Sequence, residues 1–177
     1  MAEDTVEFHE QLCNEIEAHI KYCNKNKMKP CVRLNGTSDI FEEWGFDNII
    51  KNFPDIQFYD YTKSLERMLG FIRGYVPKNY HLTFSHAEGK LDDSFMVLEN
   101  CGNVSVVFDT PPNKRLPKTW NGYTVIDGDK HDLRFINPDM RYKRDKRAGV
   151  VIGLRAKGLA RKKEAKQNSF INPHQNT

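Results

Sequence analysis

The sequence predicts an α/β protein built on a parallel sheet that does not close. Short apolar runs alternate with helical patterns along most of its 177 residues, and strands joined through helices are parallel neighbours with right-handed crossovers. About six such runs are present, fewer than the eight strands of a complete (β/α)8 barrel. We therefore expect an incomplete TIM-like barrel, or an open, twisted, mostly parallel sheet with flanking helices.

The first elements follow from helical spacing and from helix-capping residues. Apolar side chains recur every four positions in residues 4–24, which predicts an amphipathic helix. A strand is predicted over residues 31–34. Ser38 or Asp39 then caps a predicted helix that runs to Ile50.

The later elements repeat this rhythm. A strand over 56–61 leads into a helix that spans Leu65 to Ile72 and ends before Gly74 and Pro77. The other predicted strands cover 80–84, 104–108, 123–127 and 149–154, with an acid-rich connection through Leu91, Phe95 and Leu98 after the first of them. Residues 109–117 form a loop. We expect a single domain over 1–158 and a basic, partly disordered tail over 159–177.

A small polar cluster follows five of the apolar runs, and strands that end on one edge would gather these clusters into one mouth. The cluster from Asn35 to Asp39 can bind an anion through backbone N–H groups, or simply cap a helix. Lys63 can meet a phosphate, or be a solvated lysine. Ser85 and His86 are adjacent on a strand and point to opposite faces, which argues against a nucleophile–base pair.

The densest cluster is Asp-Gly-Asp-Lys-His-Asp at residues 127–132. The carboxylates of Asp127 and Asp129 beside the His131 imidazole predict a site for a divalent metal. The alternative is a β-hairpin, because Asp-Gly between two extended runs is a strong turn signal. The two interpretations are compatible, since such a hairpin would present the same side chains at the mouth.

Charge is distributed unevenly along the chain. Residues 140–166 contain eleven lysine or arginine residues and two acidic ones, so this segment carries about +9 while the whole chain carries +3. An acidic body with a basic segment favours an anionic partner. A solvated basic helix is the alternative. The candidate phosphate or nucleic-acid contacts are Arg155, Lys157, Gly158, Arg161, Lys162 and Lys163.

The four cysteines have no metal-ligand spacing, which makes a zinc or iron–sulfur site from them improbable. No apolar stretch has the length of a membrane span and no signal peptide is visible, so we expect a cytoplasmic protein with reduced thiols and no membrane partner.

Several strings together resemble the "gene product eighty-eight" type of bacteriophage, prophage and plasmid proteins, a group with no settled function. These strings are VRLNGTSDI, FPDIQFYDYTK, NYHLTFS, NVSVVFDT, YTVIDGDKHDLRF and GVVIGLRAKGLARK, and the similarity runs from about residue 30 to about residue 165. Longer relatives look like partial barrels related to radical S-adenosylmethionine enzymes, with a cysteine-rich segment before the first helix.

The resemblance implies an incomplete barrel and a mobile-element origin. No cysteine cluster precedes the first helix here, so an iron–sulfur cluster is not expected in this chain alone, and an upstream cysteine-rich partner chain is an alternative. The positions carried over as a ligand mouth are Arg33, Asn35, Asp39, Tyr61, Thr62, Lys63, Ser85, Asp109, Asp127, Asp129, His131 and Asp132.

The leading hypothesis is a non-enzymatic accessory protein that binds nucleic acid or a host nucleoprotein through the mouth and the basic tail. One alternative is a metal- or phosphate-dependent enzyme that uses the strand-end residues. Another is an inhibitor of a host defence system.

Overall fold

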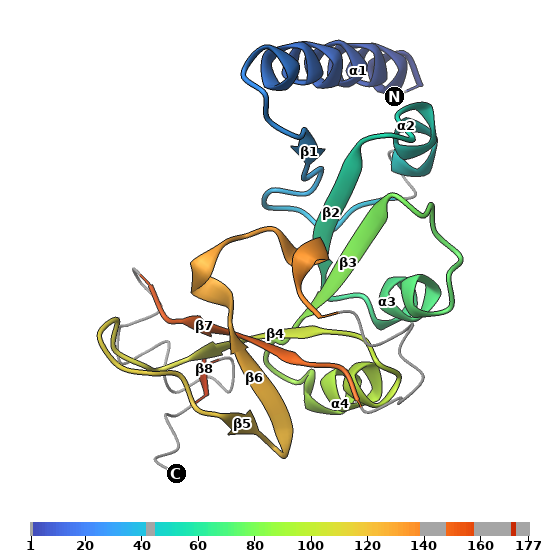
Figure 1. Cartoon of the computed structure of the whole chain (residues 1–177). Helices are drawn as coiled ribbons and strands as arrows, with labels where there is room; N and C mark the ends of the chain where they lie inside the picture. The colour runs from blue at the N-terminus through green and yellow to red at the C-terminus, as the bar shows by residue number, and fades with distance from the viewer. Residues whose placement is uncertain (1, 42–44, 139–147, 158–170, 173–177) are drawn as a thin grey trace. The chain divides into compact units, whose positions relative to one another are not determined.

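The computed structural model describes residues 2–41, 45–138, 148–157 and 171–172, with side chains over 6–41, 45–138 and 148–157 (Figure 1). Its helices are α1 (Ala2–Lys25), α2 (Phe46–Asn52), α3 (Leu65–Ile72) and α4 (Leu91–Glu99), with short 3-10 helices η1 (Gly128–Lys130) and η2 (Arg134–Ile136). Its strands are β1 (Cys31–Val32), β2 (Gln57–Thr62), β3 (Tyr80–Ser85), β4 (Val104–Phe108), β5 (Thr119–Trp120), β6 (Tyr123–Asp127), β7 (Val151–Arg155) and β8 (Ile171–Asn172).

The sheet is open and mostly parallel, which confirms the predicted fold class. Its strand order is β1-β2-β3-β4-β7-β6-β5, and β8 pairs with β4 beside this path. All the assigned pairs are parallel except β5 with β6. Among the described strands the sheet does not close into a barrel. The expected number of about six strands was too low, because the two-residue strands β5 and β8 were not predicted.

The chain divides into two compact units, each described here by itself. Unit 1 is Met1–Asp60 with Val76–His81, and unit 2 is Tyr61–Tyr75 with Leu82–Thr177. The single domain over 1–158 and the tail over 159–177 stay predictions. Of that tail, the structure describes Ile171 and Asn172, which form β8.

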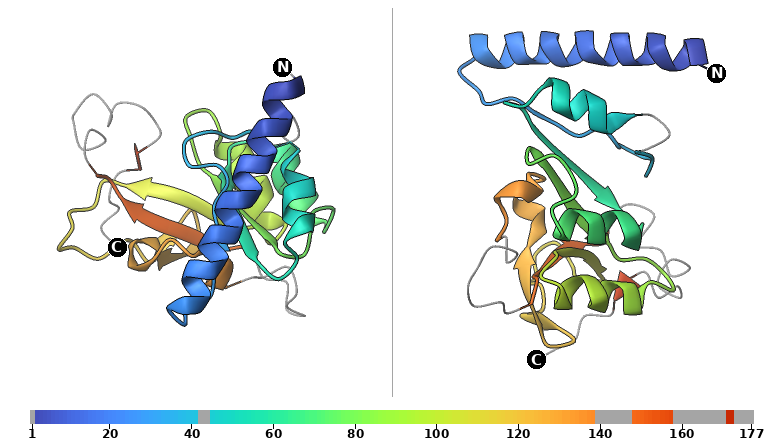
Figure 2. Two further views of the ribbon diagram at one scale, coloured as in Figure 1. Left: turned by 90° about the horizontal axis from the view of Figure 1, so that it is seen from above. Right: turned by 90° about the vertical axis from the view of Figure 1, so that its right-hand side faces the viewer.

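In unit 1, α1 lies against α2 (Figure 2). The ring centroids of Phe8 in α1 and Phe46 in α2 are 6.5 Å apart, and Ile16, Ile49 and Ile50 are buried. The apolar positions of α1 recur on one face, and burial of that face against the rest of unit 1 stabilises a helix whose other faces are charged.

One side chain ties the end of α2 to the start of β2. The Asn79 amide nitrogen donates to the carbonyl oxygens of Ile50, Phe53 and Ile56 at 3.1, 3.0 and 3.0 Å. The backbone carbonyl oxygen of Asn79 accepts from the backbone N–H of Phe58 at 2.7 Å. These bonds fix the connection from α2 to β2.

In unit 2, α3 and α4 lie side by side and pack on the strands (Figure 2). Met68, Val97, Leu98 and Val104 are fully buried between them. Gly102 has no room for a side chain, because an added Cβ would lie 2.7 to 2.8 Å from side chains of both helices. The sequence predicted α3 as a helix and the segment of α4 as an acid-rich connection, and Ser64 caps α3 by accepting from the Arg67 N–H at 3.3 Å.

The prediction of a helix starting at Ser38 or Asp39 was wrong. The helix α2 begins at Phe46, after Gly45, whose φ of 59° is left-handed. The Asn35 side chain accepts from the Ser38 hydroxyl at 2.9 Å and from the Ile40 N–H at 3.3 Å. These bonds use the polar groups that would otherwise have capped a helix, and they hold the segment in a loop.

The hairpin predicted at Asp127–Gly128 is also absent, because 128–130 and 134–136 form 3-10 turns instead of a strand pair. The hairpin in this region joins β5 to β6 through Asn121 and Gly122, with φ values of 48° and 86°. Two positive φ values in a two-residue loop are typical of a type I′ turn, for which Asn-Gly is the preferred sequence.

Candidate functional site

The parallel strands of unit 2 end at one shared edge, which we call the carboxyl edge. In the register, Phe108 of β4 pairs with Arg155 of β7, and Asp127 of β6 pairs with Gly153. Polar residues that end or follow these strands therefore gather there. The predicted residues of unit 2 at or after its strand ends are Tyr61, Thr62, Lys63, Ser85, Asp109, Asp127, Asp129, His131, Asp132, Arg155 and Lys157.

Arg155 binds the turn after β6 to the end of β7. Its Nη1 donates to Asp127 Oδ1 at 3.1 Å and to Asp129 Oδ2 at 2.9 Å. Its Nε and Nη2 donate to the Lys114 carbonyl at 3.2 and 3.0 Å, and Nη2 also donates to Asp127 Oδ2 at 3.3 Å. Every nitrogen of the Arg155 guanidinium thus donates to a protein oxygen. The Arg155 side chain is 13% exposed.

Gly128 allows this turn to lie so close to β7. A Cβ added at Gly128 would lie 2.6 Å from Ile152 Cγ2 and 2.9 Å from Leu154 Cδ2. The glycine in the Asp-Gly-Asp sequence is therefore needed for a close approach rather than for a hairpin. Asp127 stabilises the turn further, since its carboxylate accepts from the Asp129 N–H at 3.1 Å.

Asp129 contacts two cationic side chains at the carboxyl edge. The Arg155 backbone N–H donates to its Oδ2 at 3.0 Å, and the Lys157 ammonium lies 2.9 Å from its Oδ1. Burial raises the pKa of Asp129, but the bonds from Lys157 and Arg155 outweigh burial and hold the pKa below its ordinary value of 3.8. Asp129 is therefore ionised at neutral pH.

A second cluster centres on Arg134, which sequence reasoning missed. Its side chain is 2% exposed, and Nη2 donates to the carbonyls of Gly128 and His131 at 2.8 and 2.6 Å. Its Nε donates to the Tyr61 hydroxyl, which donates to Asp132 Oδ1 at 2.8 Å. The signal in the sequence is a lone cation in an apolar run, Leu-Arg-Phe, where a buried arginine must find several acceptors.

Tyr61 is kept neutral by this cluster. Burial, followed by its hydrogen bond to Asp132, raises the pKa of Tyr61 to about 12, although the Arg134 guanidinium opposes the shift. A neutral phenol can act as a hydrogen-bond donor across the physiological pH range. The arrangement orients Asp132, whose side chain is 51% exposed.

Three predicted residues, Arg33, Asn35 and Asp39, belong to unit 1. Asn35 is buried, and Asp60 Oδ1 accepts from its backbone N–H at 2.8 Å. Asp60 Oδ2 also accepts from the Tyr80 hydroxyl at 3.1 Å. Arg33 donates to the Asn35 carbonyl at 3.1 Å, and Asp39 is exposed. Asp60, a fully buried carboxylate that is not among the predicted site residues, thus fixes the loop after β1.

His86 lies within the packing of unit 2. Its Nδ1 is 3.0 Å from the Ser94 hydroxyl, which donates to the Lys90 carbonyl at 2.7 Å. Its ring centroid is 5.2 Å from that of Trp120. The serine whose hydroxyl contacts the His86 ring is therefore Ser94 of α4 and not the adjacent Ser85. This agrees with the opposite orientation of neighbouring strand residues.

No group of three or more His, Cys, Asp or Glu side chains is close enough to share a metal ion in the described part of the chain. The carboxylates of Asp127 and Asp129 contact cationic side chains instead. A metal held by Asp127, Asp129 and His131 stays a prediction. Four candidate phosphate contacts, Gly158, Arg161, Lys162 and Lys163, lie outside the described residues.

The described cysteines are free thiols, and burial raises the pKa of Cys13 and of Cys31. Free thiols with raised pKa values are poor nucleophiles at neutral pH. Among the described helices, none is both long and apolar enough to cross a bilayer.

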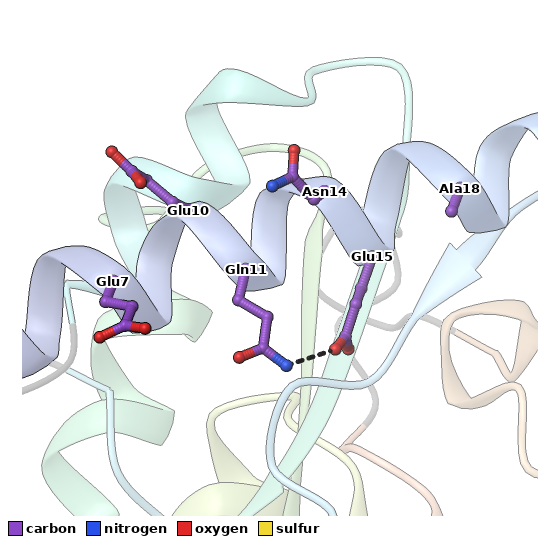
Figure 3. A pocket seen from close by; sticks show the side chains of 6 residues that line it. All are labelled: Glu7, Glu10, Gln11, Asn14, Glu15 and Ala18. Carbon is purple, nitrogen blue, oxygen red and sulfur yellow. Dashed lines mark hydrogen bonds between the residues drawn. The ribbon is translucent and has the colours of Figure 1, made fainter.

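Two hollows of the surface lie in unit 1. The larger, of about 420 Å³, lies on the outer face of α1 (Figure 3) and is lined by Glu7, Glu10, Gln11, Asn14, Glu15 and Ala18. The smaller, of about 360 Å³, lies between α1 and α2 and is lined by His9, Glu10, Cys13, Asn14, Asn48, Ile49 and Asn52. Neither hollow includes a residue predicted from the sequence.

Comparison with known families gives one match. The family model described as Gene product 88 matches residues 1–172. The chain belongs to the Gene product 88 family. This confirms the resemblance drawn from the sequence strings. No curated protein and no solved structure matches this Gene product 88 chain.

Proposed function

We propose that this Gene product 88 protein is an accessory protein of a phage or other mobile element that binds nucleic acid. The binding surface consists of the carboxyl edge of unit 2 and the basic segment 140–166. The observation that carries the proposal is the charge of that segment, with eleven basic and two acidic residues in a chain whose net charge is +3. Such a segment neutralises phosphates and releases counterions.

The position of β7 supports this choice of surface. This strand lies within the basic segment and ends at the carboxyl edge with Arg155, two residues before Lys157. The Lys157 side chain is 73% exposed, and Lys63 and Lys130 are also exposed, so three lysines of this edge lie at the surface. In the free protein Arg155 donates to protein oxygens, the Asp129 carboxylate among them, and so positions the carboxyl edge.

A salt titration tests the proposal. Binding of the full chain to labelled duplex DNA, single-stranded DNA and RNA is measured by fluorescence anisotropy over a range of salt concentrations. We expect the logarithm of the affinity to fall linearly with the logarithm of salt, with a slope near −0.9 for each duplex phosphate neutralised. A lack of detectable binding to all three at low salt would contradict the proposal.

Matched lysine variants locate the surface. Lys157→Gln should reduce the magnitude of the salt slope by about 1, because one phosphate contact is lost. Lys90→Gln is the control, since Lys90 is the N-cap residue of α4 in the same unit and pairs with Asp93 at 2.8 Å. Equal slopes for the two variants would remove the carboxyl edge from the binding surface.

A further inference from the structure

Three donors from β7 and the residues after it converge on one carboxylate. The backbone N–H and Nη1 of Arg155 lie 3.0 and 2.9 Å from Asp129 Oδ2, and Nζ of Lys157 lies 2.9 Å from Oδ1. A backbone amide, a guanidinium and an ammonium form the kind of donor set that proteins use to bind oxyanions. We call these three groups the Arg155–Lys157 cradle.

The two Arg155 groups of the cradle are held in place by bonds that do not involve Asp129. The Arg155 guanidinium is fixed by the Lys114 carbonyl and the Asp127 carboxylate. Its backbone N–H is set by the pairing of β7 with β4, where Arg155 is opposite Phe108. Most of the donor geometry would therefore persist if the Asp129 side chain moved away.

We propose that the Arg155–Lys157 cradle is a phosphate-binding subsite that the Asp129 carboxylate occupies in the free protein. A phosphate group displaces Asp129, because it offers more acceptor oxygens and more negative charge to the same donors. This inference rests on the proposed function and deepens it, since it names the point at which a phosphate is held. It also means that the Asp129 carboxylate competes with other anions for these donors, which weakens the binding of anions for which the subsite is not specific.

The test uses inorganic phosphate and the isosteric variant Asp129→Asn. The readout is the NMR signal of the Arg155 backbone amide, which is a donor of the cradle. We expect Asp129→Asn to bind phosphate about tenfold more tightly than the wild type, since a charged acceptor no longer competes for the donors. Adding Lys157→Gln to this variant should abolish the gain.

Asp92→Asn is the matched control, because it removes one exposed negative charge from α4 of the same unit. Equal phosphate affinity of Asp129→Asn and Asp92→Asn would overturn the proposal, since the effect would then be one of net charge. If Asp129→Asn does not fold, the wild type is titrated to the highest phosphate concentration it tolerates. An Arg155 amide shift that Lys157→Gln abolishes supports the cradle, and no shift overturns it.

A second arm identifies the source of the phosphate and separates this inference from the proposed function. If Asp129→Asn binds duplex DNA more tightly than Asp92→Asn does, the cradle takes a backbone phosphate. If only inorganic phosphate gains affinity, the cradle takes a free phosphate or a phosphorylated small molecule. Wild-type DNA binding without any gain for Asp129→Asn in either arm would overturn the cradle and leave the proposed function intact.

Discussion

At the scale of single residues, two arginines support the site from within. Arg134 and Arg155 have side chains that are 2% and 13% exposed, and their donors are directed at carbonyls, carboxylates and the Tyr61 hydroxyl. Buried guanidinium groups are stable only when such acceptors surround them. The exposed cations of the carboxyl edge in the free protein are therefore lysines, among them Lys157.

Tyr61 gives a prediction about alkaline pH. The folded state holds its pKa at about 12, against an ordinary value of 10.0, so the folded state favours the neutral phenol. This contribution to stability is complete below pH 10 and is lost as the pH rises toward 12. Urea unfolding at several pH values should show the wild type losing more stability over this interval than Tyr61→Phe does.

An ultraviolet titration checks the same assignment independently. The folded protein should contain a tyrosine that ionises at a pH of about 12, and Tyr61→Phe should remove that step. Parallel stability curves for the two proteins, together with an unchanged titration near this pH, would contradict the burial of the Tyr61 hydroxyl.

Gly149 gives a prediction about packing. A Cβ at this position would lie 1.7 Å from the Gly102 carbonyl oxygen, and the Gly149 N–H donates to the Leu98 carbonyl at 2.7 Å. Gly149→Ala must therefore displace backbone, and we expect it to lower the free energy of unfolding by about 2 to 3 kcal/mol in urea denaturation.

Gly70 is the control for this substitution. It lies within α3 with no atom within 4 Å of an added Cβ. Gly70→Ala should leave stability unchanged or raise it by up to about 1 kcal/mol, since alanine is the better helix former. Equal effects of the two substitutions would mean that the backbones at Gly102 and Gly149 are not in close contact.

At the scale of elements, the sequence predicted most of the longer segments and missed several short ones. The helices α1 and α3 and the strands β1, β2, β3, β4, β6 and β7 match their predicted positions within about two residues, whereas β5, β8, η1 and η2 were not predicted. Two errors occur where a side-chain hydrogen bond competes with the local pattern. Asn35 holds a loop where a helix was predicted, and Arg134 holds a 3-10 turn where a hairpin was predicted.

The β5–β6 hairpin gives the prediction at this scale. Its turn residues Asn121 and Gly122 are exposed and both have positive φ, so a substitution there tests the backbone alone. Gly122→Ala should lower the midpoint of urea unfolding, at a cost of about 1 kcal/mol, because an L residue is strained at φ 86°. Asn121→Gly, which suits the same turn, should have little effect, and a reversed order of the two would contradict the type I′ turn.

The site was predictable to the extent that it depends on strand direction. Parallel strands place Lys63, Ser85, Asp109 and Asp127 at strand ends of unit 2, as the sequence indicated. The sequence could not show which cation meets which carboxylate, because Arg155 reaches Asp127 across 28 positions of the chain. Nor could it show that Asn35 belongs to unit 1 with Asp60 as its partner.

At the scale of the whole molecule, the excess of positive over negative charge lies in one of the two units. Residues 140–166, which carry about +9, belong to unit 2, and the rest of the chain carries a net negative charge. The candidate cations at the carboxyl edge belong to unit 2 as well. The salt titration of the full chain and the phosphate titration of Asp129→Asn therefore probe the same unit at two levels of detail.

The path of the chain through its two units limits how the protein can be dissected. The chain enters unit 2 at Tyr61, returns to unit 1 at Val76, and enters unit 2 again at Leu82. A proteolytic fragment that starts at Leu82 would lack α3, and one that ends at Asp60 would lack the amide of Asn79. Neither unit is formed by a continuous stretch of sequence. A single cut in the chain therefore cannot yield one complete unit without part of the other.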